Sequence, residues 1–152
     1  ILKTINRLPL PLDRITETIQ LCEKAGIRAS CFFILGLPGS TKKSMAETVQ
    51  FSRNLMASYT EYKIATPFPG TLLYTMAKEN DWITKEGYDV LGGYTASMNV
   101  SDEFDEEYLD DLADKATANF YFNPKYLLRY VMRGEFLRTS RAFFNGKKMG
   151  AT

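Results

Sequence analysis

One stretch of the chain, FFILGLPGST over residues 32–41, limits the possible folds more than any other. It closes a short β-branched and aromatic run that starts at Ile27 and is almost without charge, which is typical of a strand buried on both faces of a parallel sheet. The run stops in the Gly-Leu-Pro-Gly of residues 36–39, a composition that favours a tight turn. The sequence therefore predicts a buried strand over residues 27–36 that ends in a rigid loop.

The segments around this strand alternate between helical and extended patterns. The expected elements are a helix over residues 13–25, the strand over 27–36, a helix over 40–57, a strand over 61–68 and a helix over 71–80. Gly26 suits the C′ position after the first helix, Ser40 or Thr41 the N-cap of the second, and Thr71 that of the third. Helices and strands that alternate through short loops predict an α/β protein with a parallel sheet.

The repeat stops at Asp81. Residues 81–100 carry three glycines and no clear period, so they are expected to form a loop or a lid. Within them, Tyr88, Tyr94 and Met98 are candidates to line a substrate pocket, although residues that shield a lid from solvent look the same. The predicted organisation is a first unit over residues 1–80, this segment over 81–100, and a helical extension over 101–152.

The helical extension has an uneven charge distribution. Residues 102–114 hold eight acids and no base, and Ser101 is the expected N-cap of the acidic helix. Residues 125–148 hold seven Lys or Arg against one acid. The basic segment has two interpretations: a contact for nucleic acid or an anionic membrane, or a packed helix whose basic face lies against the acidic helix. Its expected apolar face consists of Leu127, Leu128, Val131, Phe136 and Phe143.

Composition excludes several classes of protein. The 152 residues suit a single domain, the formal charge of +1 gives no global field for nucleic acid, and no apolar stretch is long enough to span a bilayer. With no histidine and only Cys22 and Cys31, an all-protein zinc site is not expected. The chain is therefore expected to be cytoplasmic, without nucleic acid as a partner and without a membrane span. Because it opens at Ile1 in mid-segment, we expect an internal fragment of a longer protein.

Two loops are expected at the same edge of the sheet. In a parallel sheet, ligands bind beyond the carboxyl ends of the strands. Gly36 and Gly39 follow the first strand there, and TPFPGT over residues 66–71 follows the second with two prolines and a glycine. A glycine permits unusual φ angles and close approach of a ligand to the backbone. Two rigid loops on adjacent strands favour a ligand site over a plain strand-to-helix turn.

These motifs resemble a known family. AGIRASCFFILGLPGSTKKSMAETVQF (residues 25–51) and ATPFPGTLLYTMAKENDWI (65–83) look like the second half of the catalytic domain of radical S-adenosylmethionine enzymes. The likeness is greatest to the branch that often carries an N-terminal cobalamin-binding domain. ILKTINR (1–7) is similar to the segment after that family's fourth strand, and YFNPKYLLRYVMR (121–133) to the branch's C-terminal helical extension.

The resemblance implies the C-terminal part of a partial (β/α) TIM-like barrel, followed by an α-helical extension. In that family a three-cysteine CxxxCxxC loop holds a [4Fe-4S] cluster, which cleaves S-adenosylmethionine to a 5′-deoxyadenosyl radical. The contact with adenine falls to Ile34 and Gly36, with Leu35 and Leu37 as neighbours, and Thr66 and Pro67 border the adenosyl group. The implied cofactors are S-adenosylmethionine, the cluster and, in the intact enzyme, cobalamin.

This sequence departs from the family in two respects. Ser40 stands where glutamate is usual, and the CxxxCxxC motif is missing, so the cluster ligands are expected outside this chain and the chain alone is expected to be inactive. The implied partners are the N-terminal half of the barrel and a small-molecule or peptide substrate. Two other hypotheses remain: a non-catalytic α/β module whose basic helix binds an anionic partner, and another (β/α) barrel enzyme with a nucleotide or phosphate ligand.

Overall fold

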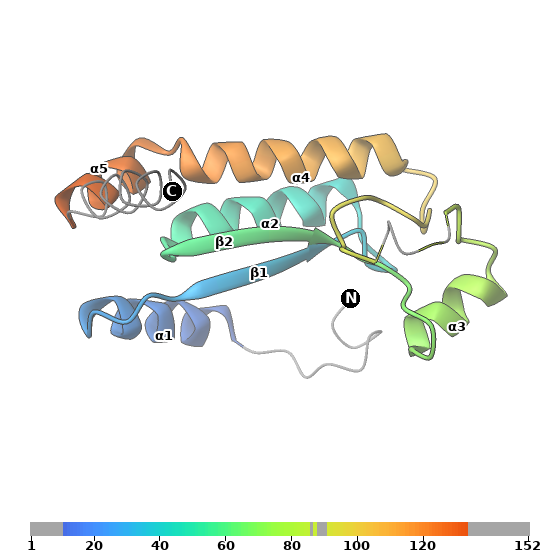
Figure 1. The fold of residues 1–152 in the computed structure, drawn as a ribbon, viewed down its shortest axis with the longest axis horizontal. Helices are drawn as coiled ribbons and strands as arrows, with labels where there is room; N and C mark the ends of the chain where they lie inside the picture. The colour runs from blue at the N-terminus through green and yellow to red at the C-terminus, as the bar shows by residue number, and fades with distance from the viewer. Residues whose placement is uncertain (1–10, 86, 88–90, 134–152) are drawn as a thin grey trace, which may run out of the picture.

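The computed structural model describes residues 11–85, 87 and 91–133. This part of the chain is a mixed α/β structure with five helices and one two-stranded parallel sheet (Figure 1). In chain order the elements are α1 (Leu12–Lys24), β1 (Ser30–Leu35), α2 (Lys42–Leu55), β2 (Tyr59–Ile64), α3 (Leu72–Glu79), α4 (Glu106–Tyr121) and α5 (Pro124–Met132). The predicted α/β class is confirmed.

Local signals place most helix ends. At the end of α1, Ile27 N donates to Cys22 O at 2.8 Å and Gly26 N to Glu23 O at 3.2 Å, with Gly26 at φ 75°. These two bonds form a Schellman motif, which ends the helix at a left-handed glycine as predicted. Helix α2 uses Thr41 as its N-cap, one of the two residues proposed for that position.

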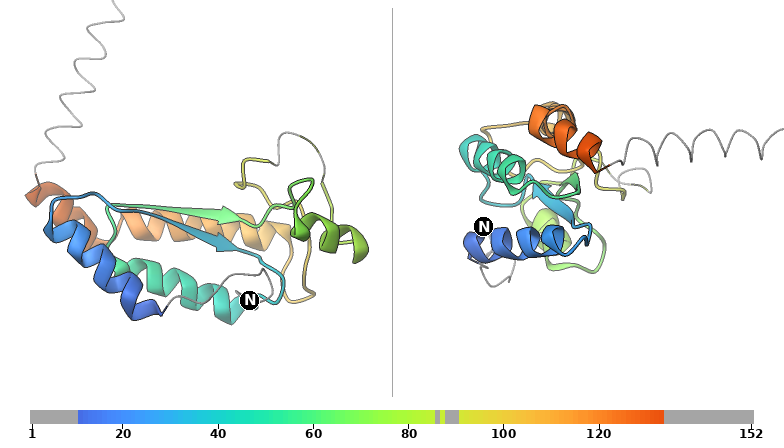
Figure 2. Two further views of the ribbon diagram at one scale, coloured as in Figure 1. Left: turned by 90° about the horizontal axis from the view of Figure 1, so that it is seen from below. Right: turned by 90° about the vertical axis from the view of Figure 1, so that its left-hand side faces the viewer.

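Among the described residues, helices cover the sheet on one face only. Its register runs from Ser30↔Tyr59 to Leu35↔Ile64, so alternate side chains of both strands share a face. Helices α2 and α4 lie along the same side of the strands (Figure 2), and Leu35 and Ile64 join Leu109 of α4 in the main hydrophobic cluster. We call the opposite side the open face; it carries Ser30, Phe32, Ile34, Tyr59, Glu61 and Lys63.

The prediction of a strand buried on both faces is therefore wrong for the described part of the chain. Phe32 is 62% exposed and Ile34 50% exposed, whereas Leu35 is 1% exposed. The strand is also shorter than predicted and begins at Ser30, because the chain still follows the helix end through Ile27. An apolar run shows that a strand is suited to burial, but not which neighbours bury it.

The acidic helix begins later than predicted. Asp105, not Ser101, is its N-cap, and the Asp105 carboxylate accepts a hydrogen bond from Tyr108 N at 2.8 Å. Ser101 instead accepts from Glu103 N at 3.1 Å, in the turn that precedes the helix. Phe104, just before the cap, joins Leu109 in the hydrophobic cluster, the arrangement of a hydrophobic staple. The packing of Phe104 with Leu109 explains why the helix begins after Asp105.

The last helix does not pack as predicted. Leu127, Leu128 and Val131 are 44%, 62% and 61% exposed, and Tyr126 is the buried residue of α5. Arg129 and Arg133 pair with Glu23 of α1, not with the acidic helix. The expected apolar residues Phe136 and Phe143 lie outside the described residues.

Candidate functional site

The loops after β1 and β2 contain the same turn. Leu37 O accepts from Ser40 N at 2.9 Å, and Phe68 O accepts from Thr71 N at 3.1 Å. In each turn a proline follows the first residue and a glycine of positive φ comes third, Gly39 at 82° and Gly70 at 85°, which is the pattern of a type II turn. We call residues 36–40 and 66–70 the strand-end loops.

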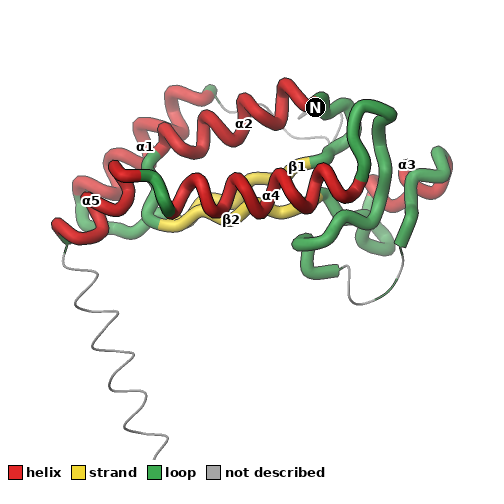
Figure 3. Tube along the Cα trace, turned by 90° about the horizontal axis from the view of Figure 1, so that it is seen from above, coloured by secondary structure: helices red, strands yellow, loops and turns green. Residues whose placement is uncertain are grey.

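Both strand-end loops lead directly into a capped helix at the same edge of the sheet. Thr41 accepts from Ser44 N at 3.1 Å and Thr71 from Tyr74 N at 3.2 Å. A bond of 2.8 Å from Ala65 N to Leu35 O joins the two strands where they end. Figure 3 shows that the loop leading into α4 reaches the same end of the sheet. The predicted meeting of the two loops is confirmed.

The predicted adenine-contact residues fall on different sides of the sheet. Ile34 lies on the open face, half exposed, beside Phe32 on the same strand. The Leu35 side chain points the other way, into the cluster between the sheet and the helices. An apolar surface for a flat ring is therefore available at Ile34 and not at the Leu35 side chain.

Gly36 is held by protein contacts. Its φ is 72°, and a Cβ added there would lie 3.0 Å from Leu109 Cδ1 and 3.2 Å from Cδ2. A left-handed φ disfavours any side chain, and a Cβ at these distances would fit only if Leu109 shifted. Packing against α4 thus accounts for the glycine without reference to a ligand.

The remaining predicted residues line the base of the loops. Thr66 is 6% exposed and its hydroxyl donates to Ile64 O at 3.1 Å, and Pro67 is buried beside it. Leu37 is partly buried against a second cluster formed by Ala65, Ala77 and Met98. These side chains hold the shape of the strand-end loops.

Glu61, Lys63 and Tyr94 form a polar group on the open face. Of these three residues, Tyr94 is the one predicted from the sequence. Lys63 Nζ lies 3.1 Å from the centre of the Tyr94 ring and 3.4 Å from Glu61 Oε2, and the Tyr94 hydroxyl donates to Glu61 Oε2 at 3.2 Å. Burial by itself would lower the pKa of Lys63, but its interactions with Tyr94 and Glu61 outweigh burial and raise that pKa. The period-two alternation of β2 could have placed Glu61 and Lys63 on one face.

The other two pocket candidates of the 81–100 segment do not join this group. Met98 is 2% exposed, belongs to the second hydrophobic cluster and bridges Ile83 as an antiparallel partner. Tyr88 lies outside the described residues. Gly93 O accepts from Ile64 N at 2.7 Å, so this part of the segment follows the outer edge of β2. Of the three candidates, Tyr94 is the one placed at the open face.

The described residues do not fit an iron–sulfur cluster. Cys22 lies on α1 and Cys31 on β1, both as free thiols, and the described ranges contain no group of three His, Cys, Asp or Glu able to hold a metal ion. Burial, with the charge of Glu23, raises the pKa of the Cys31 thiol, which disfavours the thiolate that iron needs.

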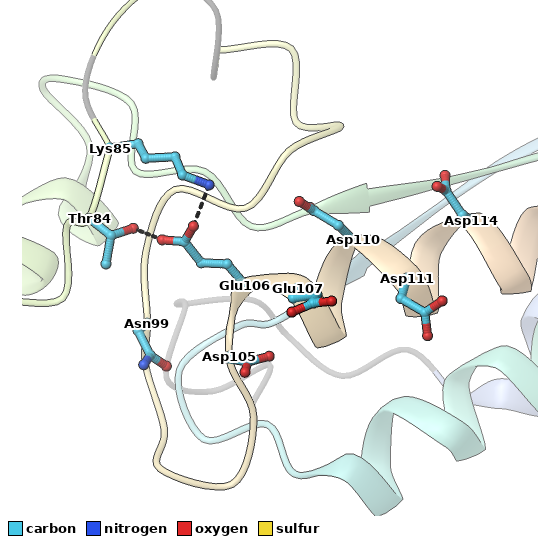
Figure 4. A pocket seen from close by; sticks show the side chains of 9 residues that line it. All are labelled: Thr84, Lys85, Asn99, Asp105, Glu106, Glu107, Asp110, Asp111 and Asp114. Carbon is cyan, nitrogen blue, oxygen red and sulfur yellow. Dashed lines mark hydrogen bonds and ion pairs between the residues drawn. The ribbon is translucent and has the colours of Figure 1, made fainter.

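An acidic groove of about 610 Å³ lies beside the first turns of α4 (Figure 4). Its lining residues are Thr84, Lys85, Asn99, Asp105, Glu106, Glu107, Asp110, Asp111 and Asp114. Glu106 pairs with Lys85 and accepts from the Thr84 hydroxyl, and Asp110 accepts from Ala96 N at 2.8 Å. Burial alone would raise the pKa of Glu106, but Lys85 and Thr84 lower it. These carboxylates therefore attach Thr84, Lys85 and Ala96 to α4.

Comparison with known proteins finds a similar protein. No family model matches the chain. The chain is 30% identical over 115 residues to a protein of Pyrococcus horikoshii described as an uncharacterized methyltransferase. That match covers 76% of this chain but 25% of the relative, so the chain spans about a quarter of the length of the curated relative that it matches. Among the described residues, none of the helices has the length and apolar character needed to cross a membrane.

Proposed function

We propose that this chain is the C-terminal portion of the catalytic domain of a radical S-adenosylmethionine enzyme, and that the intact enzyme transfers methyl groups. The observation that carries the proposal is the pair of strand-end loops, built on the same turn, at one edge of a sheet whose adjoining face is open. Ligand sites of parallel α/β folds lie at this edge.

Two further findings support the proposal. The motifs that resemble the radical S-adenosylmethionine family, ILGLPGST (residues 34–41) and TPFPGT (66–71), are the segments that form this edge. The described relative is named as a methyltransferase, and S-adenosylmethionine is the common donor of methyl groups. The relative's name also favours methylation over the ring formation and sulfur insertion that the family resemblance alone would allow.

The two strands would belong to a partial (β/α) barrel completed by the rest of the polypeptide. Within the described residues, β1 pairs with another strand along one edge only, and the open face has no helix over it. Both features are expected of strands whose remaining neighbours lie elsewhere. The open face would then line the barrel interior, where a small-molecule or peptide substrate binds.

In this proposal the chain binds part of the cofactor but does not generate the radical. Ile34 and Phe32 offer an apolar surface that fits the adenine ring, and the main chain at the end of β1 offers polar groups to its rim. S-adenosylmethionine, when cleaved at a cluster, supplies a 5′-deoxyadenosyl radical. The cluster, and cobalamin if the enzyme uses it, would be held by other parts of the intact enzyme.

The two other hypotheses are less well supported. A phosphate ligand would favour the N-terminus of α2, but the Glu103 carboxylate already accepts from Lys42 N there at 3.2 Å. A basic helix that binds an anionic partner would need free cations. In the described part of the basic segment, residues 125–133, Arg129 and Arg133 are paired with Glu23.

The sequence that precedes Ile1 in the gene gives the first test. A CxxxCxxC motif roughly 100–150 residues upstream, the spacing of half a barrel, is the expected result. The second test incubates the anaerobically purified full gene product with methyl-labelled S-adenosylmethionine and a reductant, and measures 5′-deoxyadenosine and label transfer to cell extract. The absence of both the motif and 5′-deoxyadenosine would refute the proposal.

A further inference from the structure

The side chain of Leu109 on α4 occupies the space next to Gly36 of the first strand-end loop. Leu109 is 1% exposed, and both of its terminal methyl groups lie where a side chain at Gly36 would have to be, at 3.0 and 3.2 Å from the ideal Cβ position. Both distances are tighter than ordinary Cβ packing, so a side chain at Gly36 would require Leu109 to shift by a few tenths of an ångström within a close-packed cluster.

The position of Leu109 is fixed from both sides of that loop. On one side, Leu35 at the end of β1 packs in the same cluster as Leu109. On the other side, Glu103 accepts from Lys42 N at 3.2 Å at the start of α2, and Lys42 Nζ lies 4.8 Å from the centre of the Tyr108 ring. The start of α4 is thus attached to the elements before and after residues 36–40.

We propose that Leu109 is a positioning residue that fixes the course of residues 36–40, so that the helical extension sets the geometry of the strand-end site. The leucine acts through the backbone of Gly36 and has no contact with a ligand in this proposal. That the loop so positioned binds S-adenosylmethionine rests on the proposed function; the coupling between Leu109 and the loop does not.

A double-mutant cycle on the full chain tests this coupling. The probe is hydrogen exchange of the Ser40 amide, which closes the turn by donating to Leu37 O at 2.9 Å. Gly36→Ala should speed this exchange about 5- to 150-fold, as an overpacked buried contact does. Leu109→Val removes the two terminal methyl positions, so Gly36→Ala should have several-fold less effect in that background.

Gly26 is a control that separates the effect of backbone strain from the effect of a steric clash. Gly26 has a similar φ of 75°, but no atom lies within 4 Å of its ideal Cβ position, so Gly26→Ala introduces backbone strain without a clash. Leu109→Val should leave the effect of Gly26→Ala unchanged. If Leu109→Val and Gly36→Ala act independently on Ser40, the proposal is wrong. If Gly36→Ala is unfolded but the double variant folds, the rescue supports it.

Two further measurements cover the remaining outcomes. If no variant with Gly36→Ala folds, Leu109→Phe enlarges the same contact with the glycine intact, and an unchanged Ser40 exchange rate in it overturns the proposal. Calorimetry of S-adenosylmethionine binding to the full gene product tests the proposed function separately from the proposed role of Leu109. Absent binding in the unchanged protein refutes the proposed function alone, whereas independent effects on Ser40 refute the role of Leu109 alone.

Discussion

The Glu23 carboxylate of α1 lies 2.5 Å from the guanidinium of Arg133, just beyond α5. The same carboxylate accepts from the Ser58 hydroxyl at 2.6 Å and lies 3.7 Å from Arg129, which in turn donates to Ala57 O at 2.6 Å. Glu23 therefore joins three segments at the amino-terminal end of the sheet, opposite the strand-end loops. Its side chain is 10% exposed, which makes the group sensitive to the loss of any member.

Glu23→Gln should lower the free energy of unfolding by about 1–3 kcal/mol, because it leaves two partly buried arginines without their counter-charge. Urea denaturation at neutral pH measures the change. The matched control is Glu17→Gln on the same helix, where an exposed ion pair with Arg14 at 3.7 Å should contribute less than about 1 kcal/mol. Equal effects of the two variants would show that Glu23 has no special role.

The stability of the chain should fall in acid, and Glu23 should account for part of the loss. Burial by itself would raise the pKa of Glu23, but Ser58, Arg133 and Arg129 outweigh burial and lower it from 4.5. A carboxyl whose pKa is lower in the folded state adds stability above its unfolded value, and this stability is lost as pH falls through the folded value. The difference between Glu23→Gln and the unchanged chain should therefore be present at neutral pH and shrink in acid. A difference that stays constant down to about pH 3 would contradict this account.

Tyr94 should hold residues 92–94 against β2. Tyr94→Ala removes the ring above Lys63 and the bond to Glu61, and should speed exchange of the Ile64 amide, which donates to Gly93 O at 2.7 Å. The loss of an exposed cation–π contact should increase this exchange rate about 2- to 5-fold. Tyr94→Phe keeps the ring and should have a smaller effect. Equal effects of the two variants would mean that the hydroxyl alone matters and the ring does not.

Ile34 and Leu35 should separate ligand binding from stability. Ile34→Ser, on the open face, should weaken S-adenosylmethionine binding to the full gene product by roughly 5-fold through lost apolar contact. It should change the stability much less than Leu35→Ala, which opens the core and should cost about 2–5 kcal/mol. Calorimetry and denaturation, performed on both variants, measure the two quantities. Unchanged affinity in a folded Ile34→Ser protein would remove Ile34 from the proposed site.

The chain alone should bind no iron–sulfur cluster. Cys22 and Cys31 lie on different elements, and the described residues provide no third ligand near them. Anaerobic reconstitution with iron and sulfide, followed by absorbance spectroscopy and iron analysis, tests this, with an established iron–sulfur protein reconstituted in parallel. A stoichiometric cubane-like spectrum would place the cluster ligands within this chain.

Sequence alone was sufficient for features that depend on neighbours along the chain. The left-handed end of α1 at Gly26, the cap at Thr71, the cap of α2 to within the pair Ser40 and Thr41, and tight turns after both strands all follow from local backbone preferences. These preferences act within a few residues, so the sequence of each short segment is enough to predict them. The α/β class and the meeting of both loops at one edge followed from the order of the elements.

Tertiary structure decided which side of each element is covered. Ile34 and Leu35 are both apolar, yet one is half exposed and the other buried, because α4 lies on a single side of β1. The reason for Gly36 likewise lies in Leu109, a residue distant in sequence. The pairing of Arg133 with Glu23 and of Lys63 with Tyr94 also joins distant segments. Such contacts depend on how helices pack on the sheet. The sequence pattern of one segment does not specify where a distant segment will pack against it.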